Sequence, residues 1–130
     1  MKRINGTMLV LLLTGCQLTS EPSVMDLLRQ SSNDLNKTTP LMVDQETQLD
    51  STYVLPNKFV YKYTLISYMR ENLDAEKFYN TILQQVTAYV CSSPDMQFFV
   101  DNNVDVGYSY YDMDNVYITE AVVKTADCPS

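Results

Sequence analysis

The sequence predicts an α+β domain: a four-stranded, largely antiparallel sheet with helices on one face, in the order α-β-β-α-α-β-β. Two observations predict this fold. Two stretches, residues 47–65 and 104–124, alternate apolar and polar residues with a period of two, which is typical of β-hairpins. A long segment with helical periodicity, residues 73–91, lies between them, and a shorter helical segment precedes the first hairpin.

The first predicted helix covers residues 23–35, where apolar side chains recur near helical spacing. These side chains are Val24, Leu27, Leu28 and Leu35. Ser23 can cap the helix together with Asp26, three residues further on. Pro40 prevents the helix from continuing. We expect this helix to pack on the sheet, and the alternative is a helix that binds a partner.

The first predicted hairpin joins residues 47–55 and 59–65 through a turn at Pro56-Asn57-Lys58. Alternation predicts that every second side chain of the first strand shares one face. These side chains are Leu49, Ser51, Tyr53 and Leu55. Tyr61 and Tyr63 are expected to share a face of the return strand with Phe59 and Leu65.

The long helix is predicted to begin after Asp74, which can serve as its N-cap, with Leu73 as a hydrophobic staple. Its apolar face consists of Phe78, Ile82, Val86 and Tyr89. Ser93 and Pro94 then start a short helix to about Asp101.

The second predicted hairpin consists of residues 104–110, a turn at 112–115 and a return strand at 116–124. Asp112, Asp114 and Asn115 resemble the opening of a calcium-binding loop. The glycine and the glutamate that complete an EF-hand are missing, so turn residues are the better interpretation.

Ahead of the domain, a basic start and a short apolar run up to Leu13 predict a secretory signal peptide, residues 1–15. Leu13-Thr14-Gly15-Cys16 resembles the lipobox of bacterial lipoproteins. The resemblance implies that Cys16 is lipidated and becomes the first residue after cleavage. The alternative is an ordinary signal peptide with a chance cysteine.

Residues 16–22 are expected to tether this lipid to a single periplasmic domain, residues 23–130. Gln17 stands where an aspartate would retain a lipoprotein in the inner membrane, which favours the outer membrane, facing the periplasm. Cleavage removes Lys2 and Arg3 and leaves a net charge of about −9, from the −7 of the full chain. Such an acidic domain excludes nucleic acid as a partner and leaves the acyl chains as the membrane anchor.

Cys91 and Cys128 remain as an even pair in an exported protein, which predicts a disulfide. The bond would close a loop of about 38 residues and stabilise the fold by roughly 3–4 kcal/mol. The alternatives are two free thiols or a metal site, and a metal site is disfavoured because the chain has no histidine.

The sequence predicts no catalytic residue, no cofactor, no metal and no small-molecule substrate. Without histidine there is neither a Ser-His-Asp triad nor a Cys-His dyad, and three glycines make no phosphate-binding loop. We therefore expect a binding protein and not an enzyme.

Tyrosine is the unusual residue, with ten copies against four phenylalanines and no tryptophan. Strand propensity and amphipathic core edges explain most of them, and the alternative is a tyrosine-rich surface for protein recognition. Alternation from Val104 places Tyr108 and Tyr110 in the core. Tyr111 and Tyr117 should then face outward, the latter if Val116 and Ile118 point inward, and become the predicted partner-binding residues.

One pattern runs through the C-terminal half of the chain: Cys91, Pro94, an apolar helix, a Val/Tyr strand, an Asp-containing turn, another strand and Cys128. This pattern resembles the sheet-containing pilotins of type II secretion systems. Residues 40–47 and 61–65 are also similar to an uncharacterised family of small exported domains. The pilotin resemblance implies an outer-membrane lipoprotein that carries a secretin to that membrane. The alternative function is an inhibitor or immunity lipoprotein that binds a periplasmic enzyme.

Overall fold

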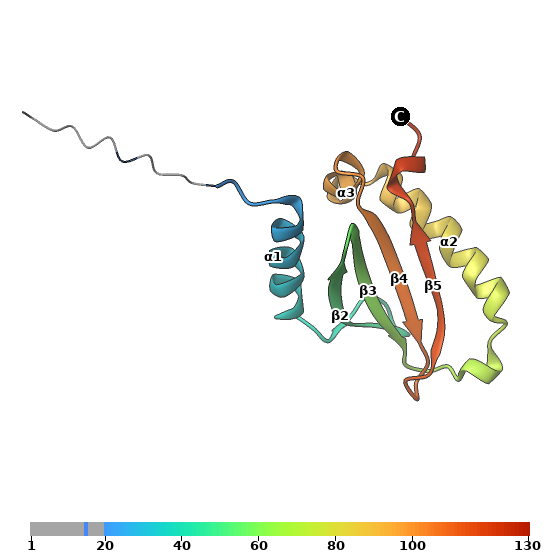
Figure 1. The fold of residues 1–130 in the computed structure, drawn as a ribbon. Helices are drawn as coiled ribbons and strands as arrows, with labels where there is room; N and C mark the ends of the chain where they lie inside the picture. Colours follow the sequence, from blue (N-terminus) through green and yellow to red (C-terminus); the bar gives the residue numbers. More distant parts are fainter. Residues whose placement is uncertain (1–14, 16–19) are drawn as a thin grey trace, which may run out of the picture.

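The computed structural model describes residue 15 and residues 20–130, which form a five-stranded sheet flanked by helices (Figure 1). The helices are α1 (Val24–Asn36), α2 (Ala75–Ser92) and α3 (Gln97–Asp101). The strands are β1 (Leu41–Met42), β2 (Thr47–Leu55), β3 (Lys58–Leu65), β4 (Asp105–Tyr111) and β5 (Tyr117–Val123). Three short 3-10 helices are η1 (Arg70–Asn72), η2 (Pro94–Met96) and η3 (Thr125–Asp127). Cys16 and the predicted signal peptide, except Gly15, lie outside the described residues.

The α+β class is confirmed, but the four-stranded, largely antiparallel sheet is wrong. The sheet has five strands in the order β1-β2-β3-β4-β5, and β3 pairs with β4 in parallel. The additional strand, β1, has two residues and is too short to show a period of two. The parallel pair arises because α2 and α3 carry the chain from the end of β3 back to the start of β4, as parallel neighbours require.

The caps predicted from the sequence hold the helix ends. Ser23 and Asp26 form a reciprocal capping box at the start of α1, and the Asp74 side chain accepts a hydrogen bond from the N–H of Lys77 in α2. Asn103 and Asn115 have positive φ angles of 51° and 62°, at the end of α3 and in the β4–β5 turn. Asparagine tolerates this left-handed conformation, so the chain reverses at the predicted positions.

β2 departs from the predicted alternation at a bulge. Its register with β3 shifts between Leu49 and Ser51, so the two residues do not share a face. After the bulge, Thr52 and Val54 pair with Tyr61 and Phe59 on the helix-covered side of the sheet. The expectation that Tyr53 and Leu55 share the face of Leu49 is therefore wrong, because the extra residue turns them to the other side.

All three α-helices cover one face of the sheet, which we call the covered face. A single hydrophobic cluster joins Leu28 of α1, Val90 of α2 and Phe99 of α3 to strand residues. The strand residues of this cluster include Phe59, Leu65, Val106, Tyr108 and Tyr110. No helix of residues 20–130 lies on the other side of the sheet, which we call the open face (Figure 1).

α1 is fixed to β2 by polar contacts as well as by Leu28. The Ser32 and Thr52 hydroxyls lie 2.7 Å apart, and both residues are buried. The Asn36 side chain donates to the Thr52 carbonyl at 2.9 Å and accepts from the Thr52 N–H at 2.7 Å. This two-way bond satisfies both backbone groups of Thr52 and sets the position of α1 along the strand.

Candidate protein-binding surfaces

Four tyrosines form a stacked ladder on the covered face. The parallel register places Tyr61 opposite Tyr108 and Tyr63 opposite Tyr110. Their ring centroids lie 5.4 and 5.2 Å apart, with interplanar angles of 14° and 20°. Phe78 of α2 meets Tyr110 edge-on at 5.1 Å. Tyr108 and Tyr110 are buried, as alternation predicted, so the ladder is part of the core.

Burial changes the acidity of these phenols. It raises the pKa of Tyr61 to about 12, with a smaller contribution from Tyr89. It likewise raises the pKa of Tyr110 to about 12, with Asp44 adding to the effect. Burial also raises the pKa of Tyr63 and Tyr108, because an ionised phenolate would lose its hydration inside the protein.

The open face carries a second set of aromatic rings. Tyr117 is 51% exposed, and its ring meets Tyr111 at 5.6 Å with an interplanar angle of 72°. The Lys62 ammonium lies 4.5 Å from the centre of the Tyr111 ring, a cation–π contact. Tyr53 of β2 is 40% exposed and lies on the same face. The structure thus brings the two predicted partner-binding residues, Tyr111 and Tyr117, into contact.

The prediction that Val116 points inward beside Ile118 is wrong. Val116 is 48% exposed and Ile118 is 4% exposed. Val116 belongs to the turn before β5, where its carbonyl accepts a hydrogen bond from the N–H of Asp112. Asp112 itself is buried and accepts bonds from the N–H groups of Arg70, Asp114 and Val116, which lower its pKa. This carboxylate therefore holds the turn together, in agreement with the turn interpretation.

An ion pair crosses the centre of the open face. Lys58 of β3 donates to Glu120 of β5 at 3.0 Å, and both side chains lie over Gly107 of β4. A Cβ atom at position 107 would lie 2.9 Å from side-chain atoms of both residues. Glycine at this position therefore lets the pair lie close against the strand.

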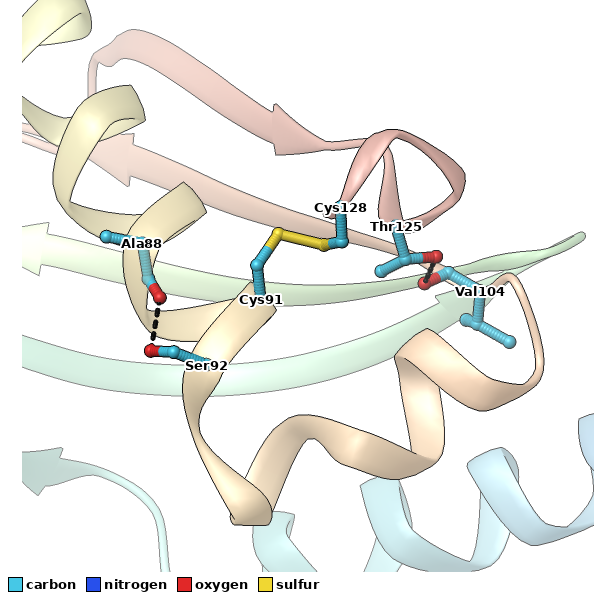
Figure 2. Close-up of a disulfide and its surroundings, with 6 residues drawn as sticks. All are labelled: Ala88, Cys91, Ser92, Val104, Thr125 and Cys128. Atoms are coloured by element: carbon cyan, nitrogen blue, oxygen red, sulfur yellow. Dashed lines mark hydrogen bonds between the residues drawn. A yellow bond between two sulfur atoms is a disulfide. The ribbon is translucent and has the colours of Figure 1, made fainter. Parts of the chain in front are cut away.

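Cys91 and Cys128 are joined by a disulfide, as the sequence predicted (Figure 2). Their Cα atoms are 5.3 Å apart, within the usual range for a bridge. The bond connects the last turn of α2 to the segment after η3. Nearby, the Thr125 hydroxyl donates to the Val104 carbonyl at 3.0 Å, which ties the same segment to the start of β4 (Figure 2). The disulfide and this hydrogen bond thus fix the C-terminal segment to the end of α2 and to the start of β4 at this end of the sheet.

A hollow lies at the opposite end of the sheet, and the sequence did not predict the residues that line it. This α2-entry pocket has a volume of about 540 Å³ and lies where β2 begins, β3 ends and α2 starts (Figure 1). Its lining includes Asp44, Glu46, Leu65, Tyr68, Leu73 and Phe78. No local pattern in the sequence could name its acidic residues, Asp44 and Glu46, which lie in the loop between β1 and β2.

Neither metal ligation nor membrane crossing is indicated in the described part of the chain. No group of three cysteine, aspartate or glutamate side chains among residues 15 and 20–130 is arranged to hold a metal ion. Within the same residues, no helix is both long and apolar enough to cross a bilayer.

Comparison with solved structures finds three of the same architecture. A secreted protein from Pseudomonas aeruginosa matches with a TM-score of 0.69 and 13% identity, over 82% of this chain and 93% of that one. EpsS, the pilotin of the Vibrio vulnificus type 2 secretion system, matches at 0.64 and 9%, over 82% and 93%. AspS, the type II secretion pilotin of Vibrio cholerae, matches at 0.60 and 11%, over 81% and 92%.

The chain has the fold of the sheet-containing pilotins. The resemblance predicted from the sequence is therefore confirmed at the level of the fold. At 9% and 11% identity the pilotin likeness shows the architecture alone, because one fold supports many functions. No family model matches the sequence, and no curated protein matches it.

Proposed function

We propose that this protein is a lipid-anchored periplasmic binding module with a pilotin-like role, assisting the outer-membrane targeting or assembly of a secretin. The observation that carries the proposal is the structural match to two pilotins, which covers four-fifths of this chain and more than nine-tenths of each pilotin. A match over this share of both chains is larger than a common supersecondary motif. In this role the protein binds and delivers its partner and catalyses no reaction.

The lipid anchor determines the membrane to which the protein is attached. Support comes from the sequence Leu13-Thr14-Gly15-Cys16 and from the acidic domain that follows it. A net charge of about −9 after cleavage would repel anionic headgroups, so the domain itself is a poor membrane ligand. Acyl chains on Cys16 supply the attachment instead, since each buried methylene contributes about 0.8 kcal/mol.

The open face supplies the partner contact. Tyr111 and Tyr117 are adjacent, and none of the helices within residues 20–130 covers them. Tyrosine is enriched among residues that dominate binding energy, because it offers a large rigid ring and a hydroxyl. The Lys62 ammonium contacts the Tyr111 ring and limits its motion in the free protein. Binding therefore costs less side-chain entropy.

The experiment is affinity capture of the lipidated protein from solubilised membranes, followed by identification of the proteins that come with it. The matched control is the double variant Tyr111→Ala/Tyr117→Ala, purified from the same membranes. We expect a secretin in the wild-type sample and its depletion in the control. A periplasmic enzyme in place of the secretin would overturn the pilotin-like role in favour of an inhibitor or immunity lipoprotein.

A further inference from the structure

The α2-entry pocket combines an apolar floor with an acidic rim. Leu65 at the end of β3 is 5% exposed, and Leu73 and Phe78 at the start of α2 are half-buried around it. Asp44 and Glu46 stand on the exposed loop before β2, at the mouth of the same hollow. The pocket therefore offers a place for a large apolar side chain directly beside two carboxylates.

Both carboxylates are held in position. Asp44 accepts hydrogen bonds from the N–H groups of Glu46 and Thr47, each at 2.8 Å. These bonds lower the pKa of Asp44 below its usual value. Glu46 accepts a bond from the Tyr68 hydroxyl at 2.9 Å, which connects it to the pocket wall. A partner would thus meet acceptors that are already ordered, at little entropic cost.

The negative charge of the rim is not neutralised within the described part of the chain. The described residues form three ion pairs, Asp26–Arg29, Asp34–Lys37 and Lys58–Glu120. None of these pairs includes a residue of the acidic rim. The described residues that line the pocket include no lysine or arginine. A cation is therefore the complementary group that this rim lacks.

We propose that the α2-entry pocket binds a protein segment in which one large apolar side chain is flanked by lysine or arginine. The apolar side chain fills the hollow over Leu65 and Phe78, while the cations meet Asp44 and Glu46. The pocket volume of about 540 Å³ suits one or two side chains, so the occupant is an anchor on a segment and not a whole helix.

The inference concerns the chemistry of the partner and holds whether or not that partner is a secretin. The pocket lies at the start of α2, and α1 begins toward the other end of the sheet (Figure 1).

The test uses the mature full-length protein and three synthetic peptides of about 18 residues, long enough for five helical turns. The first is an amphipathic leucine–lysine helix, the second replaces each lysine by glutamate, and the third replaces each leucine by serine. Calorimetry measures each dissociation constant with the wild-type protein and with Asp44→Asn/Glu46→Gln. These substitutions remove two charges but keep the acceptors for the Thr47 N–H and the Tyr68 hydroxyl.

The matched control is Asp95→Asn/Asp101→Asn, which removes the same charge from exposed positions at the other end of the sheet. We expect the leucine–lysine peptide to bind the wild type and the control alike, and to bind the pocket variant at least about tenfold more weakly. The other two peptides should bind weakly or not at all.

Equal loss in the pocket variant and the control would overturn the proposal, because attraction to the acidic domain as a whole would then explain binding. No binding of the leucine–lysine peptide below about 1 mM would overturn it as well. Failure to capture a secretin, with the peptide result as expected, would remove the pilotin-like role and leave this inference standing.

Discussion

Tyr110 and Tyr111 are consecutive residues of β4, yet they belong to different surfaces. Tyr110 is 7% exposed, stacks on Tyr63 and contacts Phe78 of α2. Tyr111 is half-exposed on the open face, between Lys62 and Tyr117. The difference comes from strand alternation, which sends neighbouring side chains to opposite sides, and from the helices, which cover one side only.

The comparison teaches that tyrosine content alone does not mark a recognition surface. On the covered face the rings are core residues, and burial raises the pKa of Tyr61 and its neighbours in the ladder. On the open face the rings remain available to a partner. Substitutions on the two faces should therefore separate stability from binding.

The largest effect is expected from Tyr108→Ala, which removes the middle of the tyrosine ladder. Tyr108 is 6% exposed and stacks on Tyr61, so truncation should lower the free energy of unfolding by about 3–5 kcal/mol. Tyr108→Phe keeps the ring and should cost less than about 1.5 kcal/mol. Chemical denaturation measures both. Equal loss in the two variants would show that the hydroxyl, and not the stacking, is the important group.

The next largest effect is expected from Cys91→Ser/Cys128→Ser, which releases the tail of β5 from α2 and so loosens the cover of one face. We expect the free energy of unfolding to fall by about 2–4 kcal/mol. Denaturation of the variant beside the oxidised wild type measures the loss. Labelling of denatured, unreduced wild type should find neither thiol free, and full labelling of both would contradict the bond.

Alkaline pH should weaken the covered face specifically. Because the pKa of Tyr61 rises from 10.0 to about 12 on folding, the unfolded chain releases this proton first. The contribution of Tyr61 to stability is therefore complete below about pH 10, and it falls between about pH 10 and 12 by about 1.4 kcal/mol per pH unit, the slope for one proton. Tyr61→Phe should make this fall shallower in unfolding curves at stepped pH. An unchanged slope would contradict the role given to burial.

The smallest effect on stability is expected from Tyr111→Ala and Tyr117→Ala on the open face. Each should lower the free energy of unfolding by less than about 1 kcal/mol, since these rings are half-exposed or exposed. Binding should instead weaken by about 2 kcal/mol or more. A melting curve and a pull-down on each variant decide the matter. Normal partner capture, or melting as poor as that of Tyr108→Ala, would remove this face from the interface.

Local signals in the sequence predicted most of the fold. Ser23 and Asp74 mark the starts of two helices because capping depends on residues within one turn. β1 was missed because its two residues form a strand only through pairing with β2. The bulge after Leu49 was missed for a similar reason, since it depends on the register with β3. The parallel β3–β4 pair carried a signal, a strand-helix-strand crossover, that the antiparallel expectation overlooked.

For the same reason, the sequence predicted the tyrosines of the strands better than it predicted the α2-entry pocket. Strand alternation was enough to place Tyr108 in the core, whereas Tyr117 is exposed although the inward Val116 on which its placement depended is wrong. The α2-entry pocket joins residues that are more than 30 positions apart, such as Asp44 and Phe78. Such contacts depend on the tertiary structure, so no local pattern could reveal that acidic and apolar groups meet there.

The most direct test of the pilotin-like role is the distribution of the secretin between inner and outer membranes in a host that depends on this protein. Fractions are compared for the wild type, a deletion, and Cys16→Ala, which keeps the domain and removes the predicted lipid site. We predict that the secretin lies in the outer membrane with the wild type and shifts to the inner membrane in the other two. An unchanged distribution of the secretin in the deletion strain would contradict the role.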